Sequence, residues 1–320
     1  MNNMKVLVLE GGHNEEHEIS LATGKQVKKA LSNLNIEYKS IIVSPNTFEE
    51  NINKFSTDYV CFNALHGPYG EDGTIQKILD DKFFRYTHSD AKTSHIGFNK
   101  ELTKKNIKKH SITTPDSVFV DYNQINKETL FNCFSKFGPF VIKPVSSGSS
   151  FGIKIFKDKE TIDLFLEKLS NNLKLYNNHR KILIEKYING RELTVAVVDL
   201  NNASNPIEVT EILTNEDFFD YKAKYTQGYS KHILPAKIPD LIYEKCLHDA
   251  QKIHKIINCK GVSRTDFIYD EEEIYFLEIN TQPGLTPVSL VPEQLGYQNV
   301  SFDELIYNLI KRACEKELHK

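Results

Sequence analysis

Residues 264–284 read RTDFIYDEEEIYFLEINTQPG, two runs rich in β-branched and aromatic residues on either side of an acidic turn. This pattern predicts a β-hairpin. Side chains alternate between the two faces of a strand, so Arg264 shares a face with Asp266, and Glu278 shares a face with Asn280. If the two strands pair, two carboxylates, an amide oxygen and a guanidinium group converge.

These four side chains suit a site for metal and phosphate. Carboxylate and amide oxygens are hard ligands that favour Mg²⁺, which keeps several waters and is shared with substrate phosphates. Arg264 can stabilise negative charge that develops on a reacting oxygen. The alternative is a surface hairpin with ordinary polar residues. Glu278 and Asn280 favour a site, because they interrupt an apolar strand that runs into Pro283-Gly284.

Length and composition predict a globular protein of two or three domains. The chain has 320 residues, of which 40% are hydrophobic and 26% charged, and its net charge is -3. Lysine and arginine are scattered, which gives no electrostatic case for nucleic acid or a membrane as partner. No run approaches the roughly 20 apolar residues of a membrane span, and residues 1–5 leave no room for a signal peptide. Five widely spaced cysteines indicate reduced thiols and a cytoplasmic location.

The first region, residues 1–97, alternates strand and helix patterns. Strands are predicted at 6–9, 38–43 and 59–65, with a helix from Ser20 to Leu34. This order predicts an open parallel sheet, whose ligands bind at the carboxyl ends of the strands. Polar clusters follow two of these strands, at 11–18 and 66–73.

The second region, residues 98–183, centres on a Gly/Ser loop. A Lys-rich helix at 100–110 precedes the strand 140–144, the loop 146–152 and a returning strand. The backbone N–H groups of such a loop can cradle phosphates. It is not a Walker loop, because no Gly-Lys-Ser/Thr opens a helix there. The alternative, a flexible hairpin tip, is weakened by Lys143 on the preceding strand. The third region, residues 184–320, contains the opening hairpin and ends with a helix at 301–315.

One short motif suggests zinc and is rejected. Residues 13–17, HNEEH, match the H-x-x-E-H pattern of a zinc-protease class. That chemistry needs both histidines on one helix face. Here the match follows a predicted strand end, and helical periodicity starts only near Ser20. Glu16 and Glu18 instead read as carboxylates near a helix N-terminus, where negative charge is favoured.

Taken together, the blocks resemble the D-alanine–D-alanine ligase family of ATP-grasp enzymes, in the family's order and over nearly the whole chain. The resemblance implies an α/β protein with an ATP-grasp fold and a Rossmann-like N-terminal domain. Two departures, Glu10 and Ser146-Ser147, touch no residue assigned to chemistry. The matching blocks are Gly11-Gly12 with 16–20, HGPYGEDG at 66–73, Lys143-Pro144 with 148–152, YKAKY at 221–225, and 278–284 with Thr286 and 289–290.

The resemblance also implies a reaction: ATP and two D-alanines give the dipeptide, ADP and phosphate through an acylphosphate, for peptidoglycan precursor synthesis. It implies two Mg²⁺ ions (or Mn²⁺) and a homodimer. Metal ligands would be Asp266, Glu278 and Asn280. Nucleotide contacts would be Lys100, Lys143 and Lys224 on the phosphates, Glu185, Lys186 and Ile188 on adenine, and Glu192 on ribose. Substrate contacts would be Glu16, Arg264, Gly284 and Ser289, with Ser149 and Tyr225 completing a latch, and with His66 and Glu71 orienting substrate.

Several alternatives stay open at this point. Lys100 and Lys186 could be solvated lysines, His66 and Glu71 could only fix their loop, and Tyr225 could be a packing residue of a mobile lid around 222–228. The acceptor could be D-lactate or D-serine, although Tyr225 argues against D-lactate. A catalytically silent ATP-binding protein is disfavoured, because the metal, phosphate and oxyanion candidates are all present.

Overall fold

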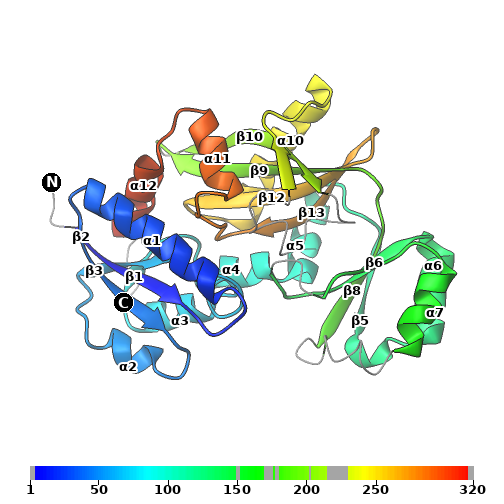
Figure 1. The fold of residues 1–320 in the computed structure, drawn as a ribbon, viewed down its shortest axis with the longest axis horizontal. Helices are drawn as coiled ribbons and strands as arrows, with labels where there is room; N and C mark the ends of the chain where they lie inside the picture. Colours follow the sequence, from blue (N-terminus) through cyan, green and yellow to red (C-terminus); the bar gives the residue numbers. More distant parts are fainter. Residues whose placement is uncertain are drawn as a thin grey trace.

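The computed structural model describes residues 4–148, 152–168, 176, 180–201, 203–214 and 230–315. Three sheets divide these residues in chain order (Figure 1). We call them the N-terminal, central and C-terminal sheets. None of the helices within these ranges is long and apolar enough to span a membrane.

The N-terminal sheet is parallel, as predicted, with strand order β2-β1-β3-β4. Strands β1 and β3 are almost fully buried, and helices separate the strands along the chain, as the predicted alternation of strand and helix requires. Helix α1 begins at His17, so His13 lies before the helix and the two histidines of the zinc-like motif share no helix face. The elements are β1 (Lys5–Gly11), α1 (His17–Asn33), β2 (Glu37–Val43), α2 (Phe48–Ile52), β3 (Tyr59–Asn63), α3 (Thr74–Asp81), β4 (Arg85–Tyr86) and α4 (Ala91–Phe98).

The central sheet is antiparallel, with order β5-β8-β6-β7. Its core contains the stacked rings of Phe140 and Phe156. The predicted boundary between residues 183 and 184 falls inside β8, so we propose a later division, after Lys186. The elements are α5 (Lys100–Ile107), the 3₁₀ turns Lys108–His110 and Tyr122–Gln124, β5 (Ser117–Asp121), α6 (Lys127–Phe137), β6 (Phe140–Pro144), β7 (Lys154–Phe156), α7 (Lys159–Glu167) and β8 (Lys181–Lys186).

The C-terminal sheet has order β11-β10-β9-β12-β13 and contains the predicted hairpin. In Figure 1, α12 lies between this sheet and the N-terminal sheet, and α11 lies over β10 at the top of the view. Helix α12 shares a core cluster with β1 and β9. The elements are β9 (Arg191–Leu200), β10 (Ala203–Thr214), β11 (Ser230–Ile233), α10 (Asp240–Ile257), β12 (Val262–Tyr269), β13 (Ile274–Asn280), α11 (Leu290–Tyr297) and α12 (Phe302–Glu315).

The hairpin prediction is confirmed in detail. Strands β12 and β13 pair so that Arg264 lies opposite Asn280 and Asp266 lies opposite Glu278. The register then shifts between Asp266 and Phe267, which is a β-bulge. Bulges often re-aim side chains next to active sites. The four polar side chains named from the sequence therefore lie together at the paired end of the hairpin.

Candidate active site

A cavity lies where the N-terminal sheet, the start of α5 and the β13 end of the hairpin meet. Eight residues expected at the site from the sequence line it, Glu71 among them. The complete lining is Glu16, Glu71, Gly97, Phe98, Lys100, Ser147, Gly148, Arg264, Glu278, Ile279, Asn280, Thr281, Gly284, Val288, Ser289 and Leu290.

Glu16 lies at the N-terminus of α1, and two glycines approach its carboxylate closely. The residue is buried, and it is the cap residue of α1. A Cβ added to Gly67, whose φ is +72°, would come 2.4 Å from Glu16 Oε2 and 2.9 Å from Asn14 Nδ2. Gly148 also approaches, because its added Cβ would lie 3.1 Å from the same oxygen. Two loops therefore need glycine where they close around this carboxylate.

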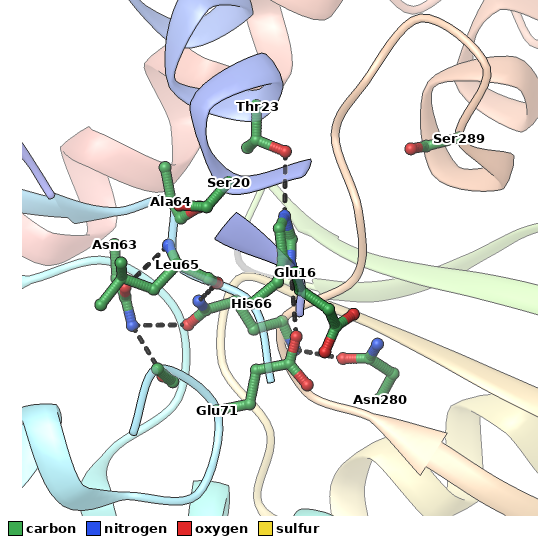
Figure 2. Close-up of polar contacts among 12 residues, drawn as sticks. Glu16, Ser20, Thr23, Asn63, Ala64, Leu65, His66, Glu71, Asn280 and Ser289 are labelled. Atoms are coloured by element: carbon green, nitrogen blue, oxygen red, sulfur yellow. Dashed lines mark hydrogen bonds and ion pairs between the residues drawn. The ribbon is translucent and has the colours of Figure 1, made fainter. Parts of the chain in front are cut away.

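His66 belongs to a buried relay that ends in the cavity (Figure 2). The Nε2 atom of His66 lies 2.9 Å from Thr23 Oγ1, and its Nδ1 atom lies 3.2 Å from Glu71 Oε1. Both ring nitrogens thus have protein partners, and Glu71 is the member that lines the cavity. In Figure 2 the side chains of Glu16, Glu71 and Asn280 turn toward the same space. His66 is therefore connected to the cavity through its contact with Glu71.

A second contact joins the N-terminal sheet to the hairpin end. Asn63, at the end of β3, donates from Nδ2 to Gln282 Oε1 at 2.8 Å, and Gln282 Nε2 donates to the Leu65 carbonyl at 2.5 Å. The Gln282 backbone N–H donates to Asn280 Oδ1 at 2.8 Å. These bonds, all buried or partly buried, fix the segment after β13 against the strand end that carries the His66 loop.

The hairpin presents charged groups that are already paired. Arg264 donates from Nε and Nη2 to the two oxygens of Asp266, both at 3.0 Å, and Thr194 Oγ1 donates to Asp266 Oδ1 at 2.5 Å. Glu278 Oε2 lies 3.0 Å from Lys100 Nζ, which also donates to the Ser147 carbonyl at 3.1 Å. Lys100 is buried, which excludes the alternative of a solvated lysine.

The donor set at the hairpin fits a magnesium ion. Asp266 and Glu278 supply carboxylate oxygens on adjacent strands, and Asn280 supplies an amide oxygen, which are the ligands Mg²⁺ prefers. The described residues contain no group of three or more His, Cys, Asp and Glu side chains placed for a metal. A metal here would therefore complete its shell with water and substrate oxygens, as Mg²⁺ commonly does.

A buried ion cluster lies beside the cavity, between α5, β6 and β8. The carboxylate of Glu185 contacts the ammonium of Lys143 through Oε1 and that of Lys104 through Oε2. Burial raises the pKa of the Glu185 carboxyl, but the two ammonium groups outweigh it and bring the pKa down to about 2. Glu185 is thus a fully ionised carboxylate in the interior.

The other residues expected at the nucleotide lie around this cluster or outside the described residues. Glu192 on β9 interacts electrostatically with Lys143, Ile188 is half-buried, and Lys186 is exposed. Ser149, Lys224 and Tyr225 lie outside the described residues, as does the lid expected around 222–228.

Sequence reasoning missed Lys104, Thr194, Gln282 and Thr23 as parts of the site. Gln282 stood inside a recognised block but received no role. Lys104 follows Lys100 by four residues, so both lie on one face of α5, and that spacing was a signal. The sequence carries no signal for Thr194 or Thr23, because a threonine that bonds a site residue looks like any other threonine of a strand or helix.

Comparison with known proteins extends these observations. Residues 106–311 match the family model described as D-ala D-ala ligase C-terminus. The chain is 42% identical to a D-alanine–D-alanine ligase of Pelagibacter ubique, over 97% of this chain and 98% of the relative. It is 39% identical to one from Sphingopyxis alaskensis, over 96% and 97%.

Solved structures share the fold. The structure of a D-alanine–D-alanine ligase from Bacillus anthracis complexed with ATP superposes with a TM-score of 0.79 at 27% identity, covering 98% of both chains. A D-Ala:D-Ser ligase from Enterococcus faecalis gives a TM-score of 0.78, also at 27% identity, covering 98% of this chain and 100% of the other. The predicted ATP-grasp fold is thereby confirmed.

Proposed function

The chain belongs to the D-alanine–D-alanine ligase family, and on that premise we propose how its cavity joins two D-alanines. The protein is an ATP-dependent ligase that makes D-alanyl-D-alanine for peptidoglycan synthesis. One observation carries the assignment of this cavity as the active site. The cavity is lined by groups that suit the substrates: the Glu16 carboxylate for an ammonium, the Arg264 guanidinium, and the paired side chains of Lys100 and Glu278.

The first step joins two anions, so it needs charge neutralisation and alignment. The first D-alanine binds with its ammonium against Glu16, and its carboxylate oxygen attacks the γ-phosphorus of ATP as ADP leaves. Lys100 and Lys143 neutralise phosphate charge, and Lys224 does so from the segment outside the described residues. Because phosphoryl transfer depends mainly on positioning and electrostatics, buried cations carried by a helix and a strand suit it.

The second step is acyl transfer to an amine. The free amine of the second D-alanine attacks the acyl carbon, and negative charge forms on the carbonyl oxygen. Arg264 and the Gly284 backbone N–H stabilise that oxygen. The intermediate then expels phosphate, and the amine loses a proton. Ser289, whose hydroxyl bonds Thr286 Oγ1 at 2.8 Å, takes the carboxylate of the second D-alanine.

The hairpin would hold two Mg²⁺ ions through Asp266, Glu278 and Asn280, with Mn²⁺ as a substitute. When bound, they would neutralise charge on the phosphates. Arg264 pairs with Asp266 and Lys100 pairs with Glu278, so both carboxylates are oriented before nucleotide arrives. Thr194 adds a fixed hydrogen bond to Asp266.

The acceptor, the assembly and the location complete the proposal. We take D-alanine as acceptor; D-serine is the second candidate, because a D-Ala:D-Ser ligase shares the fold at a similar TM-score. A homodimer is expected from the family, and size-exclusion chromatography with light scattering tests it. All five cysteines are free thiols, which supports a cytoplasmic location.

Product identification tests the proposal. Purified protein is incubated with ATP, Mg²⁺ and D-alanine, alone and with D-serine or D-lactate, and the products are identified by mass spectrometry. One ADP should form for each D-alanyl-D-alanine. ADP formation without any dipeptide would contradict the ligase assignment, and preferential formation of the D-serine product would correct the acceptor.

A further inference from the structure

The cluster around Glu185 contains a lysine to which the mechanism above gives no role. Glu185 is 2% exposed, and Lys104 and Lys143 are also buried. Each oxygen of the carboxylate contacts one ammonium: Oε1 that of Lys143 and Oε2 that of Lys104. One carboxylate therefore has two cations, one more than it needs to be neutralised.

The two lysines face different surroundings. Lys143, on β6, also interacts electrostatically with Glu278 at the hairpin and with Glu192 on β9, which are proposed contacts for metal and ribose. Lys104 comes from α5, one turn after Lys100. Lys100 reaches into the cavity, whereas Lys104 ends on Glu185. The helix thus delivers one cation to the substrate side and one behind Glu185.

We propose that Lys104 is a positioning residue for nucleotide binding, the counter-charge that Glu185 retains when Lys143 turns to the phosphates. This proposal rests on the proposed role of Lys143 as a phosphate contact. Without Lys104, a phosphate could engage Lys143 only by leaving Glu185 as an unpaired buried charge, which is strongly unfavourable. With Lys104 in place, the exchange leaves a neutral buried pair.

The electrostatics of the cluster support this exchange. Burial lowers the pKa of the Lys104 ammonium, Glu185 opposes that effect, and the neighbouring charges of Lys143 and Lys100 lower the pKa further. When Lys143 moves toward phosphate, one of these repulsions weakens while the contact with Glu185 stays. The Lys104–Glu185 pair therefore tightens on nucleotide binding, which helps to release Lys143.

Replacing Lys104 with methionine gives a test beyond lost activity. In the Lys104→Met variant, Glu185 loses its contact with Lys143 when nucleotide binds and then has no ammonium partner. We therefore expect the Glu185 carboxyl to take up a proton. The charged groups around it are then Lys143 directly, with Lys100, Glu192 and Glu278 further out. The affinity of the variant for ADP with Mg²⁺ should therefore fall as pH rises from about 7 to 9. This fall should be steeper than in wild type by up to about tenfold per pH unit.

Calorimetry in buffers of different ionisation enthalpy measures this directly. The variant should take up about one more proton per ADP bound than wild type. Its KM for ATP should rise about tenfold or more, with kcat at saturating ATP within about threefold, because only binding is affected. Lys105→Met, at the exposed neighbouring lysine of α5, is the matched control and should behave as wild type.

If Lys104→Met does not fold, Lys104→Gln keeps a donor for Glu185 without the charge and should show the same proton uptake. Equal proton uptake and equal ADP affinity in wild type and in a folded Lys104 variant would overturn the proposal. Failure of the proposed function is distinguishable, because wild type itself would then bind no nucleotide or form no dipeptide.

Discussion

Replacing Gly67 by alanine perturbs the Glu16 carboxylate without touching it chemically. The new Cβ would stand 2.4 Å from Glu16 Oε2 and 2.9 Å from Asn14 Nδ2. An ordinary contact begins near 3.4 Å, so the carboxylate must retreat by about 1 Å. Misplacing a substrate-binding group by about 1 Å can cost about 100-fold in rate. We therefore expect Gly67→Ala to lower kcat/KM for D-alanine by about 100-fold.

Alanine at position 67 also strains the backbone, and a control variant separates this strain from the effect on the carboxylate. The φ of Gly67 is +72°, and alanine in this region costs about 1 kcal/mol. Gly138, at the end of α6, has a φ of +70° but nothing within 4 Å of an added Cβ. Gly138→Ala should therefore lose stability while keeping activity within about twofold.

The assay is a steady-state measurement of ADP release at varied D-alanine, with thermal melts of both variants. The loss in Gly67→Ala should appear mainly at low D-alanine, because the carboxylate is the proposed ammonium partner. If Gly67→Ala and Gly138→Ala show the same kcat/KM for D-alanine, Glu16 does not depend on this close approach and the reasoning fails.

Three further predictions concern the hairpin and the core. Glu278→Gln keeps the shape of a proposed metal ligand and removes its charge, so turnover should fall by about 100-fold or more at ordinary Mg²⁺ while the fold stays intact; near-normal turnover contradicts the metal assignment. Thr194→Val removes the bond to Asp266 Oδ1, so the Mg²⁺ concentration for half-maximal turnover should rise about 10-fold, and an unaltered Mg²⁺ titration counts against that role. Burial raises the pKa of Asp199, but hydrogen bonds from His254 and Ser204 outweigh it and lower the pKa to about 2. The ionised Asp199 therefore stabilises the folded state by on the order of 2 kcal/mol above about pH 4, and this contribution is lost as pH falls toward 2. In the Asp199→Asn variant, the free energy of unfolding should depend less on pH in that window. An unchanged pH dependence refutes the assignment.

The hairpin was predictable because its signal is local. Alternation along residues 264–284 places Arg264 with Asp266 and Glu278 with Asn280, and pairing of adjacent strands then brings them together. The parallel N-terminal sheet was predictable for the same reason, since buried strands alternate there with a helical period. The bulge after Asp266 was not, because its signal lies in the pairing of two strands rather than in either one.

What could not be predicted depends on contacts between distant segments. Lys104 sits in a Lys-rich helix, where a lysine that meets a buried carboxylate looks like its exposed neighbour Lys105. Its partner Glu185 lies some 80 residues further along the chain. The expected boundary after residue 183 falls inside β8, because β8 joins a sheet whose other strands precede it by dozens of residues.

Oxygen-18 transfer tests the central claim most directly, because the acylphosphate requires a carboxylate oxygen of D-alanine to end on phosphate. D-Alanine labelled with oxygen-18 in its carboxylate is converted with ATP and Mg²⁺, and the released phosphate is examined by ³¹P NMR. The account predicts one labelled oxygen in each phosphate formed together with a dipeptide. Unlabelled phosphate accompanying dipeptide formation would contradict it.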